Sequence, residues 1–435
     1  ANAPEGVGGL GAEFSLEIGI ADRRAREDST NVQLSAARFV KQGGSGVPSM
    51  NAMAQVATES FKGRTSRDGG GRGTPPPQTE EAIELGLAFL ARYQQDDGSW
   101  ALDQFARLDG TPVMVSNDAA TGLAVMAFQG AGYTHNQFKY KDLLRAAIDY
   151  LISNQNEDGD YYFSQGSQGN QVVRLYSHAI VTLALCESYG MTQDQELRES
   201  VQKGLDFIVQ SQHADRGGWR YTPGRESDTS VGGWMITALE SGRRAGLEVP
   251  EQTMIKAVNW LDQAQDPDHE HLYRYNPYAP DKQGQGQGRI ATKTMTSVGL
   301  LMRLYSGWKV ADPRAIEGAE YLKRNLPSLG RGRSGSQRDT YYWYYATQFM
   351  FHMGGDYWKA WNDRLYPLLL NTQKTRGELA GSWDPRLPTP DRWGSHAGRI
   401  YVTTMNLLSL EVHYRYLPLY DDSPYKPEVA MDGSQ

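Results

Sequence analysis

The sequence predicts an all-α protein in which six helical hairpins close into an α6/α6 toroid. The first observation is that charged, amphipathic helices alternate along the chain with helices that are apolar on nearly all faces. The second is a recurring motif of glutamine, glycine and an aromatic residue, as in "QQDDGSW" at Gln94. It returns as "QNEDGDYYF" at Gln155, "QHADRGGWRY" at Gln212 and "QKTRGELAGSW" at Gln373. A length of 435 residues also exceeds the roughly 250–300 at which one compact core stops growing, which favours repeats.

Residues 1–78 differ in composition from the rest of the chain. The stretch "ADRRARED" is a solvated charge run, and "GRTSRDGGGRGTPPP" has the glycine and proline content of a linker. Only residues 31–61 hold scattered apolar side chains, enough for a helix or two laid on a neighbour. We therefore expect an N-terminal arm over 1–78, the toroid over 79–420 and a C-terminal tail over 421–435.

Six amphipathic helices are predicted from apolar residues that recur at helical spacing and leave a charged face. In the first of them, Ile83, Leu87 and Leu90 are among the apolar residues that recur over about four turns. The six cover residues 80–94, 143–155, 197–212, 253–265, 314–326 and 357–373. We expect them to form the outer ring of the toroid.

Six apolar helices are predicted between the amphipathic ones. They cover residues 117–132, 176–190, 228–242, 292–307, 339–355 and 400–416. Most end at glycine, the usual left-handed C-cap, and several begin with an Asp, Ser or Thr that can cap exposed amides. Because each hairpin can bury its apolar surface only against its neighbours, these helices should form an inner ring, and closure into a circle removes exposed ends.

The motif from glutamine to the aromatic residue is interpreted as a clamp between repeats. The glutamine ends an outer helix, where its amide can bond the free carbonyls of that helix or the amides of the next hairpin. The glycine turns the chain, and the aromatic side chain packs between neighbouring repeats.

Composition excludes several functional classes. Lysine and arginine total 44 against 51 acidic residues, a net charge of −7 with scattered positive charges, which argues against nucleic-acid binding. The best apolar run, "AIVTLALC", is far shorter than the roughly 18 residues of a membrane-spanning helix, so a soluble protein is expected. The single Cys186 excludes an internal disulfide and is expected to be a buried, inert thiol. The start "ANAP", without an initiator methionine, favours an exported or periplasmic location over a cytoplasmic one.

The motif resembles the QW repeat of squalene–hopene cyclases and of protein prenyltransferase β subunits. It matches at 94–100 and 212–219 and more loosely at 155–161 and 373–383, and the resemblance spans about residues 79–420. The chain is also similar to exported bacterial proteins with prenyltransferase and squalene oxidase repeats, through "GGWRYTPGRESDTSVGGWMITALESGRRAGLEVP" and "GRIYVTTMNLLSLEVHYRYLPLY". The resemblance implies a terpenoid-cyclase fold and an apolar or prenyl-type ligand in its central cavity.

The motifs that carry chemistry in these families are altered in this chain. Squalene–hopene cyclases protonate an alkene with an Asp-x-Asp-Asp-Thr motif, and the corresponding stretch is "RESDTS". It keeps the last Asp and the Thr as Asp228 and Thr229, but Ser227 stands where the proton donor would be. The zinc-binding Asp-x-Cys of prenyltransferases does not occur, and we expect no cofactor.

In such a ring all inner helices point the same way, so their first residues converge on one mouth of the cavity. The charged residues predicted there are Asp118, His178, Asp228, Lys293, Asp339 and Arg399. Six helix N-termini add partial positive charge, which keeps carboxylates ionised and attracts anions. These residues either cap the helices and balance one another's charges, or they form a site. Asp118, His178, Asp228 and Asp339 are of the types that bind zinc or manganese, although no short ligand motif supports a metal. Asp228 is the single catalytic candidate. It would act as a general acid, and this role requires that burial raise its pKa.

Aromatic residues of the inner helices are the other candidates for lining the cavity. Together with Thr229, the predicted set comprises Trp234, Tyr341, Tyr342, Tyr345 and Tyr401. In "DTYYWYYATQFMFH" such rings would stabilise a carbocation or cationic ligand, bind a sugar or peptide through their hydroxyls, or fill space between the two rings.

Two functional hypotheses from different classes follow. The first is an enzyme or carrier of a terpenoid-like ligand in the cavity. The second is a non-catalytic, exported scaffold that docks on a protein partner through a face of the toroid and residues 1–78. An open aromatic cavity favours the first, and a filled cavity favours the second.

Overall fold

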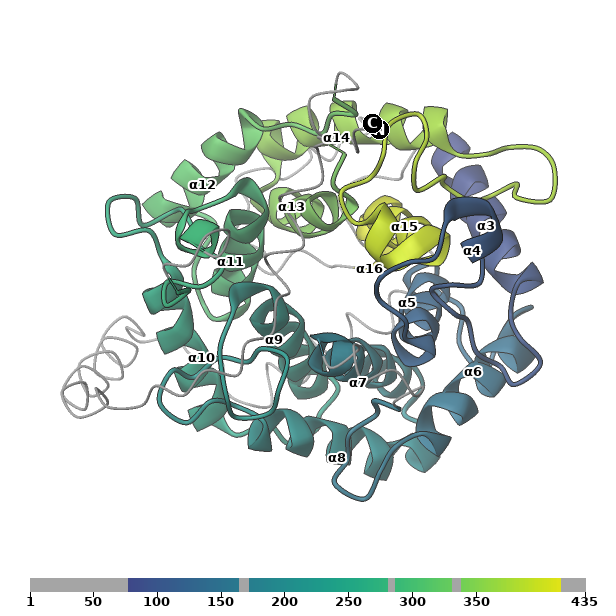
Figure 1. Ribbon diagram of the computed structural model, residues 1–435, viewed down its shortest axis with the longest axis horizontal. Helices are drawn as coiled ribbons and strands as arrows, with labels where there is room; N and C mark the ends of the chain where they lie inside the picture. Colours follow the sequence, from purple (N-terminus) through teal and green to yellow (C-terminus); the bar gives the residue numbers. More distant parts are fainter. Residues whose placement is uncertain (1–76, 164–171, 281–285, 331–337, 416–435) are drawn as a thin grey trace, which may run out of the picture.

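The computed structural model describes residues 77–163, 172–280, 286–330 and 338–415. The predicted N-terminal arm, apart from its last two residues, and the predicted C-terminal tail lie outside this part of the chain. Every regular element in the described residues is a helix, and β pairing there is limited to isolated bridges. The prediction of an all-α toroid is confirmed (Figure 1).

Six amphipathic helices form the outer ring (Figure 1). They are α3 (Pro77–Arg92), α6 (Lys141–Ser153), α8 (Gln195–Gln210), α10 (Glu251–Ala264), α12 (Pro313–Lys323) and α14 (Gly355–Thr372). Each buries one stripe against the inner ring, as α8 does with Leu197, Val201, Leu205 and Ile208. The spacing of these four residues places them on one face of a helix, so the charged face is left to solvent.

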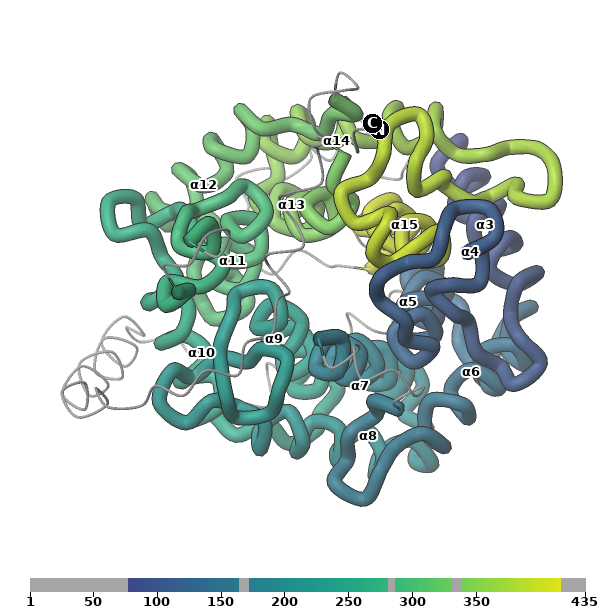
Figure 2. The backbone as a smooth tube through the Cα atoms, viewed as in Figure 1, coloured from purple at the N-terminus to yellow at the C-terminus, as the bar shows by residue number. Residues whose placement is uncertain are grey.

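Six apolar helices form the inner ring, and successive members contact each other around the circle (Figure 2). They are α5 (Asn117–Gly130), α7 (Arg174–Thr192), α9 (Thr229–Arg244), α11 (Lys293–Tyr305), α13 (Thr340–Met353) and α15 (Gly394–Leu410). The last member, α15, packs on the first, α5, and in the outer ring α14 packs on α3. The chain therefore closes on itself, so that the first and last hairpins pack against each other.

The glutamine of the motif joins neighbouring outer helices. The Gln94 amide nitrogen donates to the carbonyl of Gly98 in its own loop at 2.8 Å and to that of Leu143 in α6 at 2.9 Å. Gln373 does the same toward Gly381 at 3.0 Å and Ala82 in α3 at 2.8 Å, which closes the ring. The glutamine side chain thus bonds backbone carbonyls of the next hairpin, and not the backbone amides of that hairpin that were expected from the sequence.

The tryptophan of the motif bonds a free carbonyl at the end of the outer helix before it. The indole nitrogens of Trp100 and Trp219 donate to the carbonyls of Leu90 at 2.9 Å and Ile208 at 2.8 Å. Both rings are almost completely buried between the helix layers. The motif therefore acts as a clamp: its glutamine hydrogen-bonds the next outer helix, and its tryptophan ring packs between the outer and inner rings.

The last inner helix differs from its prediction over 400–416. The segment α15 begins at Gly394, is broken at Gly398, and ends at Leu410, before the short α16 (Val412–Arg415). Gly398 has φ 73°, and a side chain there would meet the carbonyl oxygen of Leu102 at 2.5 Å. Only glycine fits this close approach, so the backbone breaks there, two residues before the predicted start at residue 400.

The two ends of the toroid have connections of very different length. At the end where the inner helices begin, long loops carry the short helices α4 (Ala106–Asp109) and η2 (Gly286–Arg289), which the sequence analysis did not predict. At the opposite end the connections are short, as between α7 and α8, where only residues 193–194 intervene. Long loops on a rigid frame are the usual place for a site. Within the described residues, no helix combines the length and apolarity needed to cross a bilayer.

Candidate ligand-binding site

A cavity of about 200 Å³ opens at the end of the toroid where the inner helices begin. Each inner helix contributes at least one residue from its cap or first two turns, for example Ser116 at α5, Ser230 at α9 and Thr294 at α11. The residues that line it are Leu102, Met114, Ser116, Ala119, Leu123, Val173, Tyr176, Ser177, Ile180, Tyr221, Ser230, Trp234, Tyr275, Gln287, Gly288, Thr292, Thr294, Met295, Tyr341, Arg392, Trp393, Ala397 and Tyr401. The first residues of the inner helices therefore do share one mouth.

The cavity lining is predominantly aromatic and apolar. Its seven aromatic residues are Tyr176, Tyr221, Trp234, Tyr275, Tyr341, Trp393 and Tyr401. Serine and threonine hydroxyls supply most of the remaining polar groups, and Arg392 is the one charged side chain in the lining among the described residues. Such a surface suits an apolar body with a few polar anchor points.

Hydrogen bonds between lining residues hold several of the tyrosines in place. The Tyr176 hydroxyl donates to Ser230 Oγ at 2.8 Å, and Ser230 Oγ lies 2.8 Å from the Tyr341 hydroxyl. On the next part of the wall, the hydroxyls of Tyr221 and Tyr275 lie 2.6 Å apart. Burial raises the pKa of Tyr221 to about 12, so its hydroxyl keeps its proton at neutral pH. These contacts satisfy the hydroxyls of four lining tyrosines within the wall itself.

Trp234 and Tyr341, both predicted from sequence, belong to a packed aromatic group on α9 and α13. The rings of Trp234 and Tyr344 stack at 5.4 Å, and those of Tyr341 and Tyr345 lie 5.0 Å apart. Trp234, Tyr341 and the predicted Tyr401 line the cavity, while the predicted Tyr345 is buried behind them. The rings in the lining are therefore held by a second set of rings.

Asp228 is completely buried and caps α9. One carboxylate oxygen accepts the Val231 amide at 2.8 Å, and the other accepts the Tyr275 hydroxyl at 3.0 Å. Burial raises the pKa of Asp228 to about 6, opposed mainly by the charge of Arg220, whose Nε lies 3.6 Å away. Asp228 does not line the cavity, because Tyr275 stands between them. Its neighbour Thr229 is also buried and donates to the carbonyl of Arg274 at 2.6 Å.

The other two predicted aspartates also serve the backbone around the mouth. Asp118 accepts from the Asn154 amide group at 2.9 Å and the Phe163 amide at 3.0 Å. Burial raises the pKa of Asp118 to about 6, against these two hydrogen bonds. Asp339 caps α13 and accepts from the hydroxyl of Thr294 at 3.1 Å. Asp118 and Asp339 are outside the lining, but Asp339 positions a threonine that belongs to it.

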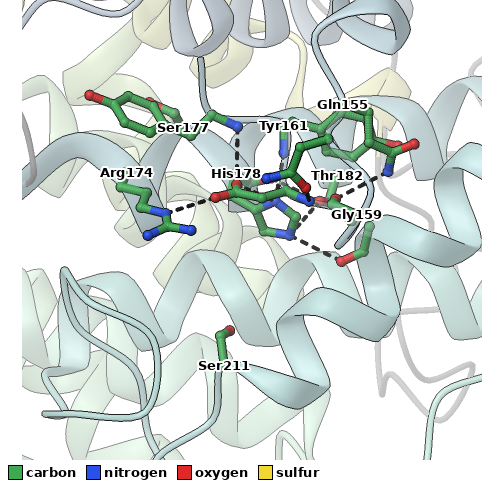
Figure 3. A network of polar contacts seen from close by, with 12 residues as sticks. Gln155, Gly159, Tyr161, Arg174, Ser177, His178, Thr182 and Ser211 are labelled. Carbon is green, nitrogen blue, oxygen red and sulfur yellow. Dashed lines mark hydrogen bonds and ion pairs between the residues drawn. The ribbon is translucent and has the colours of Figure 1, made fainter. Parts of the chain in front are cut away.

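His178 belongs to the clamp between repeats, where it lies beside Tyr161 and Thr182 (Figure 3), and it is outside the cavity lining. Its Nδ1 lies 3.2 Å from both the Tyr161 amide nitrogen and a carboxylate oxygen of Asp160, and its Nε2 lies 3.0 Å from the carbonyl oxygen of Gly204. In other repeats a threonine occupies this role, as where Thr121 accepts from the Trp100 amide at 3.0 Å. His178 therefore replaces a hydroxyl in a repeated structural contact.

Three more predicted mouth residues also lie outside the cavity lining. Arg399 is buried and pairs with Asp109 at 2.7 Å and Asp384 at 3.1 Å. Tyr342 points to the outer ring, where its hydroxyl donates to the carbonyl of Asn325 at 2.8 Å. Lys293 is half-buried at the start of α11, with its ammonium 4.9 Å from the centre of the Tyr342 ring.

The predicted set of metal ligands is not brought together. Asp118, His178, Asp228 and Asp339 contact different parts of the backbone, as described above. Within the described ranges, no three His, Cys, Asp or Glu side chains are grouped so that they could share one ion.

Several lining residues escaped the sequence analysis although a signal for them existed. Tyr221 follows the motif residue Trp219 by two positions, and Tyr275 follows Tyr273, which occupies the same place in its repeat. Leu102, two positions after Trp100, lines the cavity as well. In these three repeats the second residue after the buried aromatic lines the mouth, whereas Phe163 and Pro385, at the same place in two other repeats, do not. Arg392 and Trp393 lie just before α15 and carry no comparable signal.

Comparison with known proteins supports the fold and a distant relationship. No family model matches the chain. Over 228 residues it is 26% identical to the squalene–hopene cyclase of Zymomonas mobilis, a match that covers 46% of this chain and only 31% of that cyclase.

Solved structures with the same fold bind chemically different ligands. An inactive variant of an α-1,6-mannanase from Salegentibacter, in complex with α-1,6-mannotriose, aligns with TM-score 0.55 and 10% identity over 77% of this chain and 99% of that one. The type II terpene cyclase MstE of Scytonema, in complex with geranylgeranyl dihydroxybenzoate, aligns with TM-score 0.50 and 13% identity over 79% and 98%. The fold is an α/α toroid. At these identities the likeness concerns the fold alone, so ligand class must be argued from the lining itself.

Proposed function

We propose that the protein binds an apolar, prenyl-type ligand in the cavity at the mouth of its inner ring. The observation that carries the proposal is the lining of seven aromatic residues from four inner helices and the loops that precede them. Aromatic faces bind extended apolar chains by burial of area, and they attract any positive charge that develops on such a chain. The sequence similarity to squalene–hopene cyclase supports the same ligand class.

The lining argues against hydrolysis of a glycan, the chemistry of the mannanase that shares this fold. Most glycosidases need two carboxyl groups on either side of the scissile bond. Among the described residues no Asp or Glu lines the cavity, and Asp228 lies behind Tyr275. A saccharide would also leave most of the aromatic wall without a matching apolar surface.

Asp228 remains the one catalytic candidate within this proposal. A proton could leave it only through Tyr275, whose hydroxyl contacts both Asp228 at 3.0 Å and Tyr221 at 2.6 Å. Ser227, at the position of the cyclase proton donor, is buried outside the lining. Ligand binding is therefore the primary proposal. Catalysis would be added to it if the wild-type protein converted squalene or a linear prenyl chain and Asp228→Asn abolished that turnover.

The scaffold hypothesis has less support. It relies on residues 1–78, nearly all of which lie outside the described part of the chain. The structured cavity, which a scaffold does not require, favours the ligand-binding hypothesis.

Titration with farnesol and with mannotriose tests the proposal, with tryptophan fluorescence and calorimetry as readouts. Farnesol should bind the wild-type protein, and Trp234→Leu should weaken it about tenfold or more, because one large face of the wall is lost. The matched control is Trp308→Leu, which removes a half-buried tryptophan outside the lining and should leave farnesol binding unchanged. Binding of mannotriose without farnesol, or equal effects of both variants, would contradict the proposal.

A further inference from the structure

Two serines from neighbouring inner helices lie side by side in the wall of the cavity. Ser116 is the cap residue of α5, and Ser177 lies in the first turn of α7. Both residues line the cavity, and their hydroxyl oxygens are 2.8 Å apart. Ser177 is completely buried and Ser116 is only 3% exposed. These two residues are called the serine pair below.

The serine pair carries one hydroxyl proton that has no acceptor among the described residues. Two hydroxyl groups have two protons, and the contact between them uses one of these, whichever serine donates. The Ser116 oxygen also accepts the Ala119 amide at 3.1 Å, but this bond occupies a lone pair and no hydroxyl proton. In the described part of the chain neither hydroxyl makes a further hydrogen bond, so the second proton is left over.

Other hydroxyls of the lining donate their protons within the protein. Three such bonds are those of Tyr176 to Ser230 at 2.8 Å, Tyr275 to Asp228 at 3.0 Å and Thr294 to Asp339 at 3.1 Å. The Tyr401 hydroxyl has the side chain of Thr340 as its hydrogen-bond partner. These groups therefore need nothing from a ligand, and the serine pair differs from them.

The polar side chains at the rim of the cavity also differ from the serine pair. Gln287, Thr292 and Arg392 are in the lining but are exposed, so solvent hydrates them whether or not a ligand is bound. A ligand that fills the cavity would instead exclude water from the buried serine pair. A buried donor that loses its water without gaining another acceptor weakens binding of that ligand.

The wall around the serine pair is apolar. Met114, Ala119, Val173 and Ile180 line the cavity on α5, on α7 and at the residues that lead into them. The helix α13, which carries Tyr341, lies across the ring from α7 (Figure 1). The lining thus combines a buried hydrogen-bond donor with an apolar and aromatic surround, which matches one acceptor oxygen on an otherwise apolar molecule.

From these contacts we infer that the ligand is an oxygenated prenyl-type molecule, with an ether, carbonyl or hydroxyl oxygen that accepts a hydrogen bond from the serine pair. The inference rests on the proposed function and specifies its ligand class. It assigns Ser116 and Ser177 as the binding residues for that oxygen. A pure hydrocarbon would leave the second proton of the pair buried without an acceptor.

Titration with three ligands that share the farnesyl chain tests the inference: farnesene, farnesyl methyl ether and farnesyl acetate. Tryptophan fluorescence is the readout. The ether and the ester can accept a hydrogen bond but cannot donate one, and farnesene can do neither. The wild-type protein should bind the ether, the ester or both about fivefold or more tightly than farnesene, because only an acceptor satisfies the serine pair.

The test variant combines Ser116→Gly with Ser177→Ala. It should lose most of the preference for the oxygenated ligands and leave farnesene binding unchanged. Glycine is chosen at residue 116 because it caps a helix with little loss of stability. The matched control is Ser409→Ala, since Ser409 is buried outside the lining and donates to the carbonyl of Met405 at 2.9 Å. This control should keep the full preference.

The outcomes separate the inference from the proposed function. Equal binding of all three ligands to the wild-type protein, or a preference that survives in the double variant, overturns the inference and leaves the proposed function standing. If none of the three ligands binds, the proposed function fails and the inference fails with it. Thermal unfolding of each variant shows whether the fold is retained, so that a lost preference is not confused with a lost structure.

Discussion

At the scale of single residues, the aspartates show how one side chain type is used differently within one ring. Asp160 is buried, yet hydrogen bonds and charges from its partners, first His178, hold its pKa below the usual value despite burial. For Asp228, burial outweighs the charge of Arg220 and the hydrogen bonds from Val231 and Tyr275, so its pKa rises to about 6. The second case destabilises the folded state whenever the carboxylate is ionised.

The pKa of Asp228 predicts a specific dependence of stability on pH. The folded chain binds this proton more readily than the unfolded chain, where the pKa is about 3.8, so stability from this group is lost as pH rises from about 4 to about 6. Asp228→Asn lacks this loss while still capping the helix. Relative to wild type, its free energy of unfolding should rise by up to about 3 kcal/mol between pH 4 and pH 7.

Denaturant unfolding at the two pH values checks this prediction. Asp160→Asn is the matched control, because a lowered pKa stabilises the folded state at high pH and that variant should not gain over the same range. A difference between Asp228→Asn and wild type that stays constant with pH would show that Asp228 titrates normally in the folded chain.

At the scale of elements, the clamp explains why the hairpins stay in register around the ring. Gln212 donates to the carbonyl of Gly217 at 2.8 Å and to that of Thr253, in the first turn of α10, at 3.0 Å. Trp219 then fills the space between the layers with its indole bonded to Ile208. One motif thus fixes an outer helix to its own loop and to the next outer helix.

Truncation of a clamp tryptophan should be strongly destabilising. Trp219→Ala removes a fully packed indole and one of the two hydrogen bonds to the Ile208 carbonyl, the other coming from the Ser211 hydroxyl. The free energy of unfolding should therefore fall by about 3–5 kcal/mol, and Trp100→Ala should behave alike. Trp308→Ala, at a half-buried position outside the motif, should cost less. Urea denaturation measures all three, and losses below about 1 kcal/mol at both motif positions would mean that the motif is not a clamp.

The sequence was sufficient to predict the helices, but not all of the cavity wall. Apolar periodicity locates both rings to within a few residues, because each helix type has one dominant environment. It misses the turn of α15 that precedes Gly398 and the interruption between α15 and α16 at Glu411. Lining residues on inner helices, such as Trp234, could be predicted from helix position. Tyr275 and Arg392 come from loops whose path depends on contacts distant in sequence.

At the scale of the whole molecule, the toroid brings the starts of six separate helices to one mouth. Solved structures with this fold hold ligands as different as mannotriose in a mannanase and geranylgeranyl dihydroxybenzoate in a terpene cyclase. The frame sets where a ligand lies, and the residues just before and within the first turns set which ligand it is. In this chain those residues are mainly aromatic and apolar, and Arg392 is the one charged side chain in the lining among the described residues.

Native mass spectrometry after incubation with a total lipid extract tests the central claim most directly. The wild-type protein should retain one molecule of isoprenoid mass, and Trp234→Leu should retain far less of it, because that residue forms part of the cavity wall. A wild-type spectrum without any lipid adduct, or the same adduct in equal amount on both proteins, would contradict the account that the mouth cavity binds a prenyl-type ligand.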